Sequence, residues 1–261
     1  MNTGYRHKRL YYRTPISDIM KRDFLKDTVR KDTDFSKTDQ NRGVPPPPVQ
    51  KPVPKNAELI DLPEPVRVNA KIDLAQVISQ RKSRRTYSHE PLSMEELSFL
   101  LWATQGIRMK LDQGHAYRVV PSAGCRHSLE TYIAAFRVDG LDKAIYRYLP
   151  LNHRLVKVRV HVDLEERMTR AALDQPFAGS CAATFVWTTI PYRMEWRYAE
   201  ASYKVIAIDA GHVCQNLYLA CEAVGCGTCA IAAYDQELVD ALLGVDGREE
   251  FTVYLSPVGK V

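Results

Sequence analysis

Hydrophobic residues recur every three to four positions in five stretches of the chain, a spacing that predicts helices. The first stretch follows Asp73, which can cap a helix, and should end near Arg81–Arg85. The second begins with a capping box, formed by Ser93 and Glu96, and Gly106 can end it. The three later helices are expected at residues 163–173, 203–224 and 235–243, where Asp163 and Asp235 are caps and Gly225 and Gly244 are stops.

Runs rich in β-branched and aromatic residues predict strands between these helices. Asp139-Gly140 is a hairpin signal, so the runs on either side of it should pair. The expected strands cover residues 131–137, 144–149, 155–160, 181–189 and 251–255, and residues 226–233 form a strand or a loop. Strands that alternate with helices but also form hairpins predict a mixed sheet with helices around it, in the α+β or α/β class.

The first 65 residues differ from the rest in composition. They hold nine of the fifteen prolines, four of them consecutive at 45–48, which predicts an extended, polyproline-like arm. Six apolar or aromatic residues of this arm are candidates for burial against the body. They are Tyr11, Tyr12, Ile16, Ile19, Phe24 and Leu25. The sequence thus divides into an arm, residues 1–65, and a body, residues 66–261.

Charge is unevenly distributed between these two parts. The arm carries 13 Lys and Arg against 9 Asp and Glu, and the body carries 23 against 22. Acids are interleaved with bases in the arm, which favours a solvated segment over one that binds nucleic acid or an anionic membrane. The near-neutral body also argues against nucleic-acid binding.

Localisation is inferred from the apolar segments and the cysteines. We see no apolar run typical of a signal peptide, and the apolar stretch 203–224 carries too many polar residues to span a membrane. We therefore expect a cytoplasmic protein. The pair Cys226 and Cys229 is either a redox dithiol or packing in the core. The histidines and cysteines lack metal-ligand spacing, so no metal site is expected.

Four short clusters could carry chemistry. Arg81–Arg85 places four cations and one hydroxyl in five residues, which suits a phosphate or is only a solvated basic turn. Pro121–Gly124 is a small-residue turn that a flat ring could approach closely. Residues 226–233 have little side-chain bulk and could expose backbone amides. Gly259 and Lys260 could bring one more cation to a phosphate.

The order of these clusters resembles the nitroreductase superfamily. Arg-x-Ser-x-Arg at 81–85, a helix ending in Leu-Leu-Trp-Ala-Thr-Gln-Gly, and then Pro-Ser-Ala-Gly are similar to its opening. Residues 209–217 resemble the central helix of its SagB-like branch, and 256–260 resemble its ending. The arm is similar to the leader of stand-alone SagB-like proteins. The resemblance implies an α+β fold with a mixed, mainly antiparallel sheet surrounded by helices, and a homodimer that binds FMN at its interface.

The resemblance also implies roles for individual residues. Arg81, Lys82 and Ser83 would hold the FMN phosphate with Lys260 beside Gly259, and Arg85 would lie near the ribityl chain and the pyrimidine edge. The turn formed by Pro121, Ser122, Ala123 and Gly124 would line the flavin from the partner subunit. Ala232 and Ala233 align with the segment that offers a backbone N–H to flavin N5.

The implied reaction is ping-pong electron transfer from NADH or NADPH to a small organic acceptor, by hydride transfer at flavin N5. One departure concerns the azoline-oxidising members of the branch, which carry a Lys-Tyr pair where this chain has Arg197 and Tyr198. The catalytic candidates are this pair, Arg197 and Tyr198, and Lys204. Because arginine is a poor general base, Tyr198 could act alone or Lys204 could take the place of the missing lysine. We therefore rank a reductase above an azoline-to-azole dehydrogenase or a flavin-binding protein without turnover.

Overall fold

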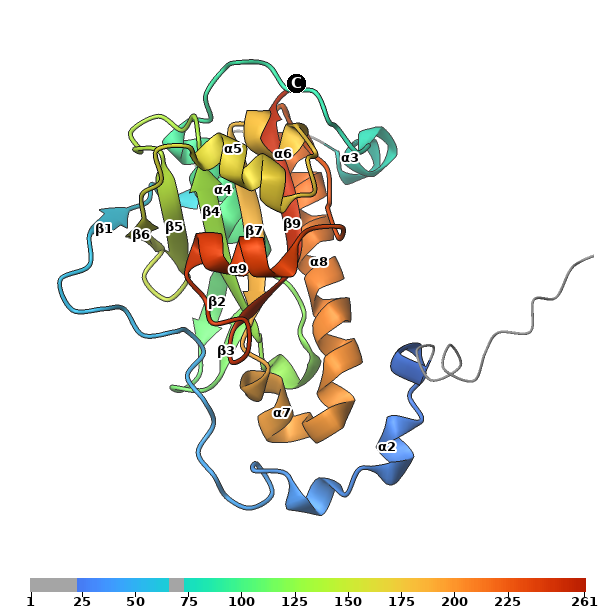
Figure 1. The fold of residues 1–261 in the computed structure, drawn as a ribbon. Coiled ribbons are helices and arrows are strands. Elements are labelled where there is room, and N and C mark those ends of the chain that lie inside the picture. The colour runs from blue at the N-terminus through green and yellow to red at the C-terminus, as the bar shows by residue number, and fades with distance from the viewer. Residues whose placement is uncertain (1–22, 66–72) are drawn as a thin grey trace, which may run out of the picture.

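The computed structural model describes residues 23–65 and 73–261, so Tyr11, Tyr12, Ile16 and Ile19 lie outside the described residues. A seven-stranded sheet forms the centre of the molecule, with strand order β1-β6-β5-β4-β7-β9-β8 (Figure 1). All six neighbouring pairs of strands are antiparallel. The strands are β1 Leu59–Asp61, β4 Leu129–Ala135, β5 Ala144–Leu149, β6 Arg154–Arg159, β7 Ala183–Thr189, β8 Cys226–Thr228 and β9 Phe251–Lys260. A separate hairpin pairs β2, Ile107–Lys110, with β3, Ala116–Arg118. The predicted α+β class is confirmed.

Helices cover both faces of the sheet, and each face has its own hydrophobic core. One core joins α4, Met94–Gln105, and α8, Ser202–Ala223, to the sheet. The other joins α5, Leu164–Ala171, α6, Phe177–Ser180, and α9, Gln236–Leu243, to the opposite face. Each central strand is therefore buried on both sides, which explains the nearly continuous apolar runs in β4, β5 and β7. The remaining helices are α2 Val29–Asp32, α3 Leu74–Gln80 and α7 Tyr192–Tyr198, with short 3₁₀ turns at Asp23–Leu25 (η1), Phe35–Lys37 (η2), Ala123–Cys125 (η4) and Ala199–Ala201 (η5).

The predicted helix ends are largely confirmed because they depend on local contacts. The Asp73 carboxylate accepts a hydrogen bond from the Ala75 N–H at 2.8 Å, and Ser93 with Glu96 forms both bonds of the capping box. Gly244 ends α9 in the left-handed conformation. Asp163 stands at the expected cap position of α5, but its carboxylate makes no capping hydrogen bond and instead pairs with Arg167.

The last strand is longer than predicted. The expectation was 251–255, whereas β9 continues to Lys260. Pro257 and Gly259 weaken the strand signal in this stretch. Pairing with β7 on one side and β8 on the other overrides that local preference, because both neighbours supply hydrogen-bond partners.

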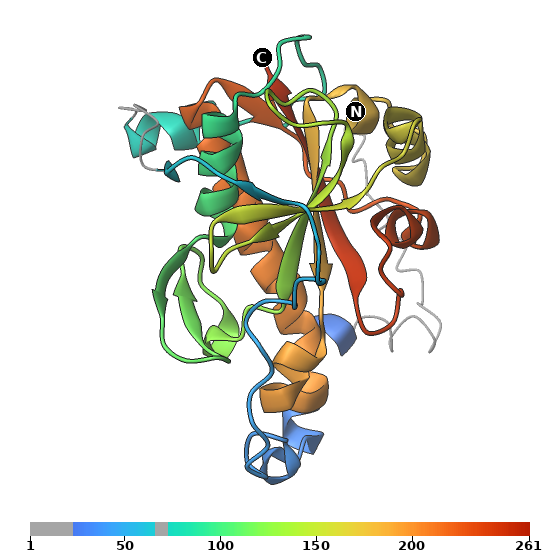
Figure 2. The ribbon, with the colours of Figure 1, turned by 90° about the vertical axis from the view of Figure 1, so that its left-hand side faces the viewer.

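From β1 the arm runs in extended form down along the body, and its earlier residues form the short helices η1, α2 and η2 near the beginning of α8 (Figures 1 and 2). Its polar contacts with the body use mainly its backbone. The Arg118 guanidinium donates to the Val49 carbonyl at 2.7 Å, and Arg147 donates to the Lys51 and Pro52 carbonyls at 2.9 and 2.8 Å. Such contacts suit a proline-rich segment, because its carbonyls have no partners within the segment itself.

A buried carboxylate organises these arginines. Glu130 on β4 accepts hydrogen bonds from Arg193 at 2.6 Å, Arg147 at 3.3 Å and the Lys51 N–H at 2.8 Å. Burial works to raise its pKa, but Arg193 and Arg147 outweigh burial and the pKa lies below its ordinary value. Glu130 thus connects the sheet, α7 and the arm through charge.

We predict that Glu130→Gln lowers the free energy of unfolding by about 3 kcal/mol or more, because two buried guanidinium groups lose their counter-charge. A depressed carboxyl pKa contributes stability at neutral pH that is lost as pH falls through the folded-state pKa. Urea unfolding as a function of pH should therefore show a flatter acid limb in the variant. Asp163→Asn, which removes an exposed ion pair, is the control and should leave the midpoint nearly unchanged. An equal effect of the two substitutions would contradict this account.

Candidate functional site

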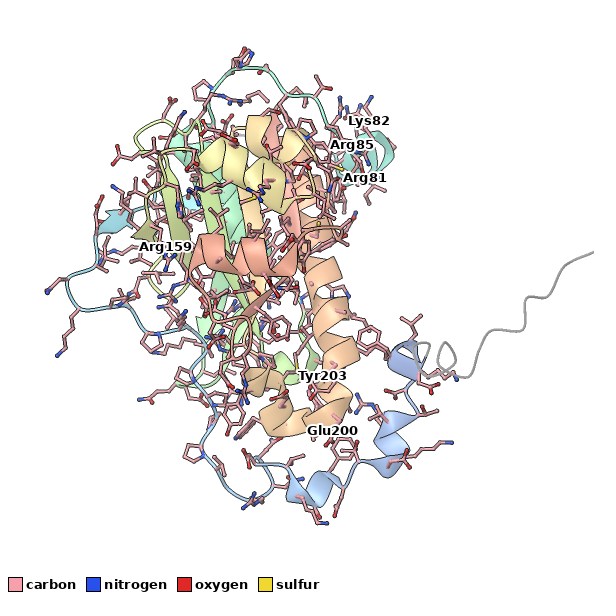
Figure 3. All side chains as sticks on the ribbon, viewed as in Figure 1. Arg81, Lys82, Arg85, Arg159, Glu200 and Tyr203 are labelled. Atoms are coloured by element: carbon pink, nitrogen blue, oxygen red, sulfur yellow. The ribbon has the colours of Figure 1, made fainter. Side chains whose placement is uncertain are left out.

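Residues Arg81–Arg85, called the cationic loop below, follow directly after α3 (Figure 3). Their backbone is held by β8, because the Arg84 N–H donates to the Thr228 carbonyl at 2.9 Å and Ser83 forms a parallel bridge with Thr228. The side chains of Lys82, Ser83 and Arg85 remain exposed. The loop is therefore fixed in position while its charged groups stay accessible.

The cations of this loop are poorly neutralised. Arg84 lies 3.9 Å from Glu222, whereas no carboxylate of the described residues approaches Arg81, Lys82 or Arg85 within ion-pair distance. The Arg81 guanidinium instead lies over the Tyr218 ring, 5.1 Å from its centroid, and that of Arg85 lies 5.8 Å from the Phe177 centroid. Neighbouring cations without carboxylate partners favour a bound anion, so the loop is a candidate for binding a phosphate group.

Tyr218, near the C-terminal end of α8, is a site residue that sequence reasoning missed. Its hydroxyl lies 3.0 Å from the Ser83 Oγ and accepts a hydrogen bond from the Ala230 N–H at 2.8 Å. One phenol therefore connects the cationic loop to the segment that contains Ala232 and Ala233. The only sequence signal was a polar-tipped aromatic on an apolar helix, which does not identify partners so distant along the chain.

The end of β9 makes contacts that the sequence did not suggest. Lys260 forms an ion pair with Glu96, the capping-box residue of α4. Partial burial opposes protonation, but the hydrogen bond to Glu96 prevails and the pKa of Lys260 is raised. Gly259 packs against Tyr87, because a Cβ there would lie 2.8 Å from that side chain. Lys260 would have to leave Glu96 to contribute its full charge to a phosphate.

The small-residue turn, Pro121–Gly124, lies against α7 and α8. Gly124 has a φ of 56°, and a Cβ at this position would lie 2.5 Å from the Tyr198 hydroxyl and 2.9 Å from Arg197. Asp209 of α8 lies beneath the turn: burial raises its pKa, and hydrogen bonds from Ser122 and the backbone of Ala123 only partly offset that effect. The turn thus meets Arg197 and Tyr198 within one chain.

The three catalytic candidates are only partly brought together. Tyr198 lies between two guanidinium groups, those of Arg197 and of Arg30 from the arm, at 5.5 and 5.7 Å from its ring centroid. The Lys204 amino group turns to the arm instead, 3.4 Å from the Leu25 carbonyl and 3.7 Å from the Asp27 carboxylate. Lys204 is therefore engaged in holding the arm.

Ala232 lines a cavity of about 560 Å³, called the α8 cavity below. Its walls are the first turns of α8, from Tyr203 to Gly211, the beginning of β9, and Phe24 of the arm. None of the described residues that line it carries a charge. Ala233 is exposed outside it, and its carbonyl accepts a hydrogen bond from the Gln175 amide at 2.9 Å.

Cys226 and Cys229 are both buried and form no disulfide. Burial raises the pKa of Cys226 to about 12, so its reactive thiolate form is suppressed at neutral pH. These observations favour packing over a redox dithiol. Among the described residues, no cluster of three or more His, Cys, Asp or Glu could hold a metal ion, and no helix is both long and apolar enough to cross a membrane.

Comparison with known proteins gives consistent matches. The profile of the nitroreductase family matches residues 78–260. A nitroreductase-like protein of Methanocaldococcus jannaschii is 30% identical over 190 residues, which cover 72% of this chain and 91% of that protein. The trifolitoxin-processing protein TfxB of Rhizobium leguminosarum bv. trifolii is 26% identical over 58% of this chain and 41% of its own length. The crystal structure of a nitroreductase-like protein from Ralstonia eutropha superposes with a TM-score of 0.66 at 25% identity, over 83% of this chain and 98% of that one.

We predict that Gly124→Ala displaces Tyr198 and destabilises the fold, since the new methyl group has no room beside the phenol and the guanidinium. The matched control is Gly43→Ala, at a residue with a φ of 78° but nothing within 4 Å of the added Cβ. Both substitutions carry backbone strain, so their difference measures the steric conflict, which we expect to be about 1–3 kcal/mol in urea unfolding. Equal losses of unfolding free energy in the two variants would contradict a steric conflict at Gly124.

Proposed function

The chain belongs to the nitroreductase family and is thereby an oxidoreductase, and we propose that it binds FMN and passes electrons from NADH or NADPH to a small organic acceptor. The observation that carries this proposal is the cationic loop with its accessible cations, joined through Tyr218 to the segment Ala230–Ala233. This arrangement connects a phosphate-binding geometry to a site where backbone amides and small side chains are available.

The residues present fit FMN. Arg81, Lys82 and Ser83 supply two cations and a hydroxyl, the set that a phosphate dianion requires. The cationic loop and the α8 cavity lie on the same face of α8. Gly211 lines the cavity and Tyr218 contacts the loop, and these residues are seven positions apart, which is close to two full turns or about 10 Å along the helix. A phosphate at the loop would therefore place the rest of the cofactor toward Ala232.

The same helix supports a homodimer with the cofactor at its interface. Asp209, which holds the small-residue turn, and Tyr218, which contacts the cationic loop, are nine positions apart on α8. Nine residues turn a helix by about 900°, which is half a turn beyond two full ones, and advance it about 13.5 Å. The two segments thus lie on opposite faces of α8, so we infer that a flavin held by one chain receives its small-residue turn from a second copy.

The proposed roles of the residues follow from this arrangement. When bound, FMN supplies reversible two-electron chemistry, taking a hydride from the nicotinamide and returning it to the acceptor in a second half-reaction. Arg81 and Lys82 anchor the phosphate, and Tyr218 holds the Ala230 N–H so that the segment leading to Ala232 keeps its position. The small residues at Ala232 and Ala233 leave room for a reactant beside the ring. All six cysteines are free, which suits the reducing cytoplasm.

A second candidate, azoline oxidation during peptide maturation, is favoured by the similarity to the trifolitoxin-processing protein. That relative also supports the SagB-like branch. The pair Arg197 and Tyr198 lies at the small-residue turn, where it could reach a substrate bound beside the flavin. Arginine is a poor general base, which leaves Tyr198 without the lysine of the azoline-oxidising pattern. We therefore rank the reductase first. The open α8 cavity argues against a protein that stores FMN with its ring face filled.

The decisive measurement is an anaerobic titration of the purified, desalted protein with NADH and with NADPH. We expect visible flavin absorbance that one of the two nucleotides bleaches, because the nicotinamide reduces the bound flavin. Flavin absorbance that neither nucleotide bleaches would count against a nucleotide-fed reductase and favour substrate oxidation. A colourless protein that fails to take up added FMN would overturn the flavin assignment.

The phosphate role of the cationic loop has a separate test. We predict that Arg81→Ala weakens FMN binding roughly 10- to 100-fold, the value of one charge-assisted phosphate contact, while riboflavin binding is nearly unchanged because riboflavin lacks the phosphate. Isothermal titration calorimetry of both flavins measures the difference. Arg167→Ala removes an exposed arginine of α5 and serves as the control. Equal losses for FMN and riboflavin would place Arg81 away from the phosphate.

A further inference from the structure

Within the described part of the N-terminal arm, residues 23–65, Phe24 contributes to the wall of the α8 cavity. We propose that Phe24 is a specificity-determining residue, which limits the size of the molecule that reaches the reaction site beside Ala232. The inference rests on the proposed function, since it assigns the α8 cavity to the reacting molecule. It gives the arm a role in the reaction itself, beyond its contacts with the body.

The position of Phe24 in the cavity wall explains how its side chain can limit the size of the reacting molecule. The other lining residues belong to packed elements of the body, namely β7, α8, the loop and first turn that follow Ala232, and β9. Phe24 belongs to the short turn η1 and is 52% exposed, so one part of its ring faces solvent while another part borders the cavity. It thus forms part of the outer rim, whereas most of the other lining residues belong to the helices and the sheet of the body.

The segment that carries Phe24 is held by contacts with α8 and α7. The Lys204 amino group binds the Leu25 carbonyl and the Asp27 carboxylate, the two contacts nearest to Phe24. One helical turn farther along the arm, the Arg30 guanidinium lies over the Tyr198 ring. The arm then continues to Gln40, whose N–H donates to the Trp196 carbonyl at 2.9 Å.

These contacts also give Lys204 a different role from the one that the sequence suggested. It contacts the segment that presents Phe24, so it acts as a positioning residue for the rim. Its partners are the Leu25 carbonyl and the Asp27 carboxylate, so this contact depends on the Lys204 amino group and on Asp27, and not on the side chains of Phe24 or Leu25.

The test compares Phe24→Ala with Leu25→Ala in the full-length protein. Leu25 is the adjacent arm residue, is 72% exposed and does not line the cavity, and its backbone carbonyl still meets Lys204 in the alanine variant. The probes are a small electron acceptor, 1,4-benzoquinone, and a bulky one, 9,10-phenanthrenequinone. For Phe24→Ala we expect the ratio of kcat/KM for the bulky over the small quinone to rise about tenfold or more, because the limiting ring is gone.

Leu25→Ala should leave that ratio at the wild-type value. Phe24→Trp should lower it, because a larger ring narrows the rim, and this opposite change excludes mere loosening of the arm. The inference would be overturned if the bulky-to-small ratio of kcat/KM in Phe24→Ala, Phe24→Trp and Leu25→Ala equalled that of the wild type. Normal flavin content and normal bleaching by nucleotide in these proteins would leave the proposed function intact.

Isothermal titration calorimetry of the two quinones with the oxidised protein measures the ratio of their affinities without turnover. If the wild-type protein is not reduced by either nucleotide, the proposed function fails, and the binding ratio still decides on Phe24. A bulky-to-small binding ratio that rises about tenfold in Phe24→Ala supports the size limit, and an unchanged ratio overturns it.

Discussion

The geometry of α8 constrains the rest of the site. A helix distributes its side chains around 360° every 3.6 residues, so each face of α8 can serve only one set of contacts. One face carries Tyr203, Ala210 and Tyr218 toward the α8 cavity and the cationic loop. The opposite face carries Asp209 under the small-residue turn. A third face, with Ile208 and His212, is exposed along the helix. These faces diverge, so the two segments expected to hold one flavin lie on different sides of α8, which supports the proposed homodimer.

Charge is handled in two different ways in this protein. In the interior, Glu130 neutralises Arg193 and Arg147 within hydrogen-bond distance, as buried charges require. In the cationic loop, Arg81 and Lys82 have no carboxylate partner among the described residues, although Glu222 is close enough for Arg84. Two accessible cations and the Ser83 hydroxyl on neighbouring residues form an arrangement suited to an external anion. The Arg81–Tyr218 stacking keeps the guanidinium in place without neutralising it.

The arm connects the stability of the body with the proposed reaction site. Its middle section is bound through backbone carbonyls at Val49, Lys51 and Pro52, which pin an otherwise extended proline-rich segment. The described part of its earlier section lies along the beginning of α8 and reaches the rim of the cavity at Phe24. Arginine and lysine side chains of the body thus bind both sections, and Val49 is in addition buried against the body.

Local sequence determined the elements and their ends. Asp73, the Ser93–Glu96 capping box and Gly244 act within one helical turn, so their effect could be predicted before any tertiary contact was known. The order of short clusters at 81–85, 121–124 and 256–260 also identified the nitroreductase family, which the comparisons confirm. These signals are carried by neighbouring residues, and no partner elsewhere in the chain is needed to interpret them.

Tertiary structure decided which of these residues meet. Tyr218 and Ser83 are 135 positions apart, and Lys260 and Glu96 are 164 apart, so no sequence spacing could relate them. The extension of β9 to Lys260 came from two flanking strands that override Pro257 and Gly259. Lys204 was predicted as a base, yet the path of the arm turns its amino group toward Leu25 and Asp27. Such outcomes depend on how separate elements pack together, and a linear pattern of hydrophobic and polar residues does not specify that packing in advance.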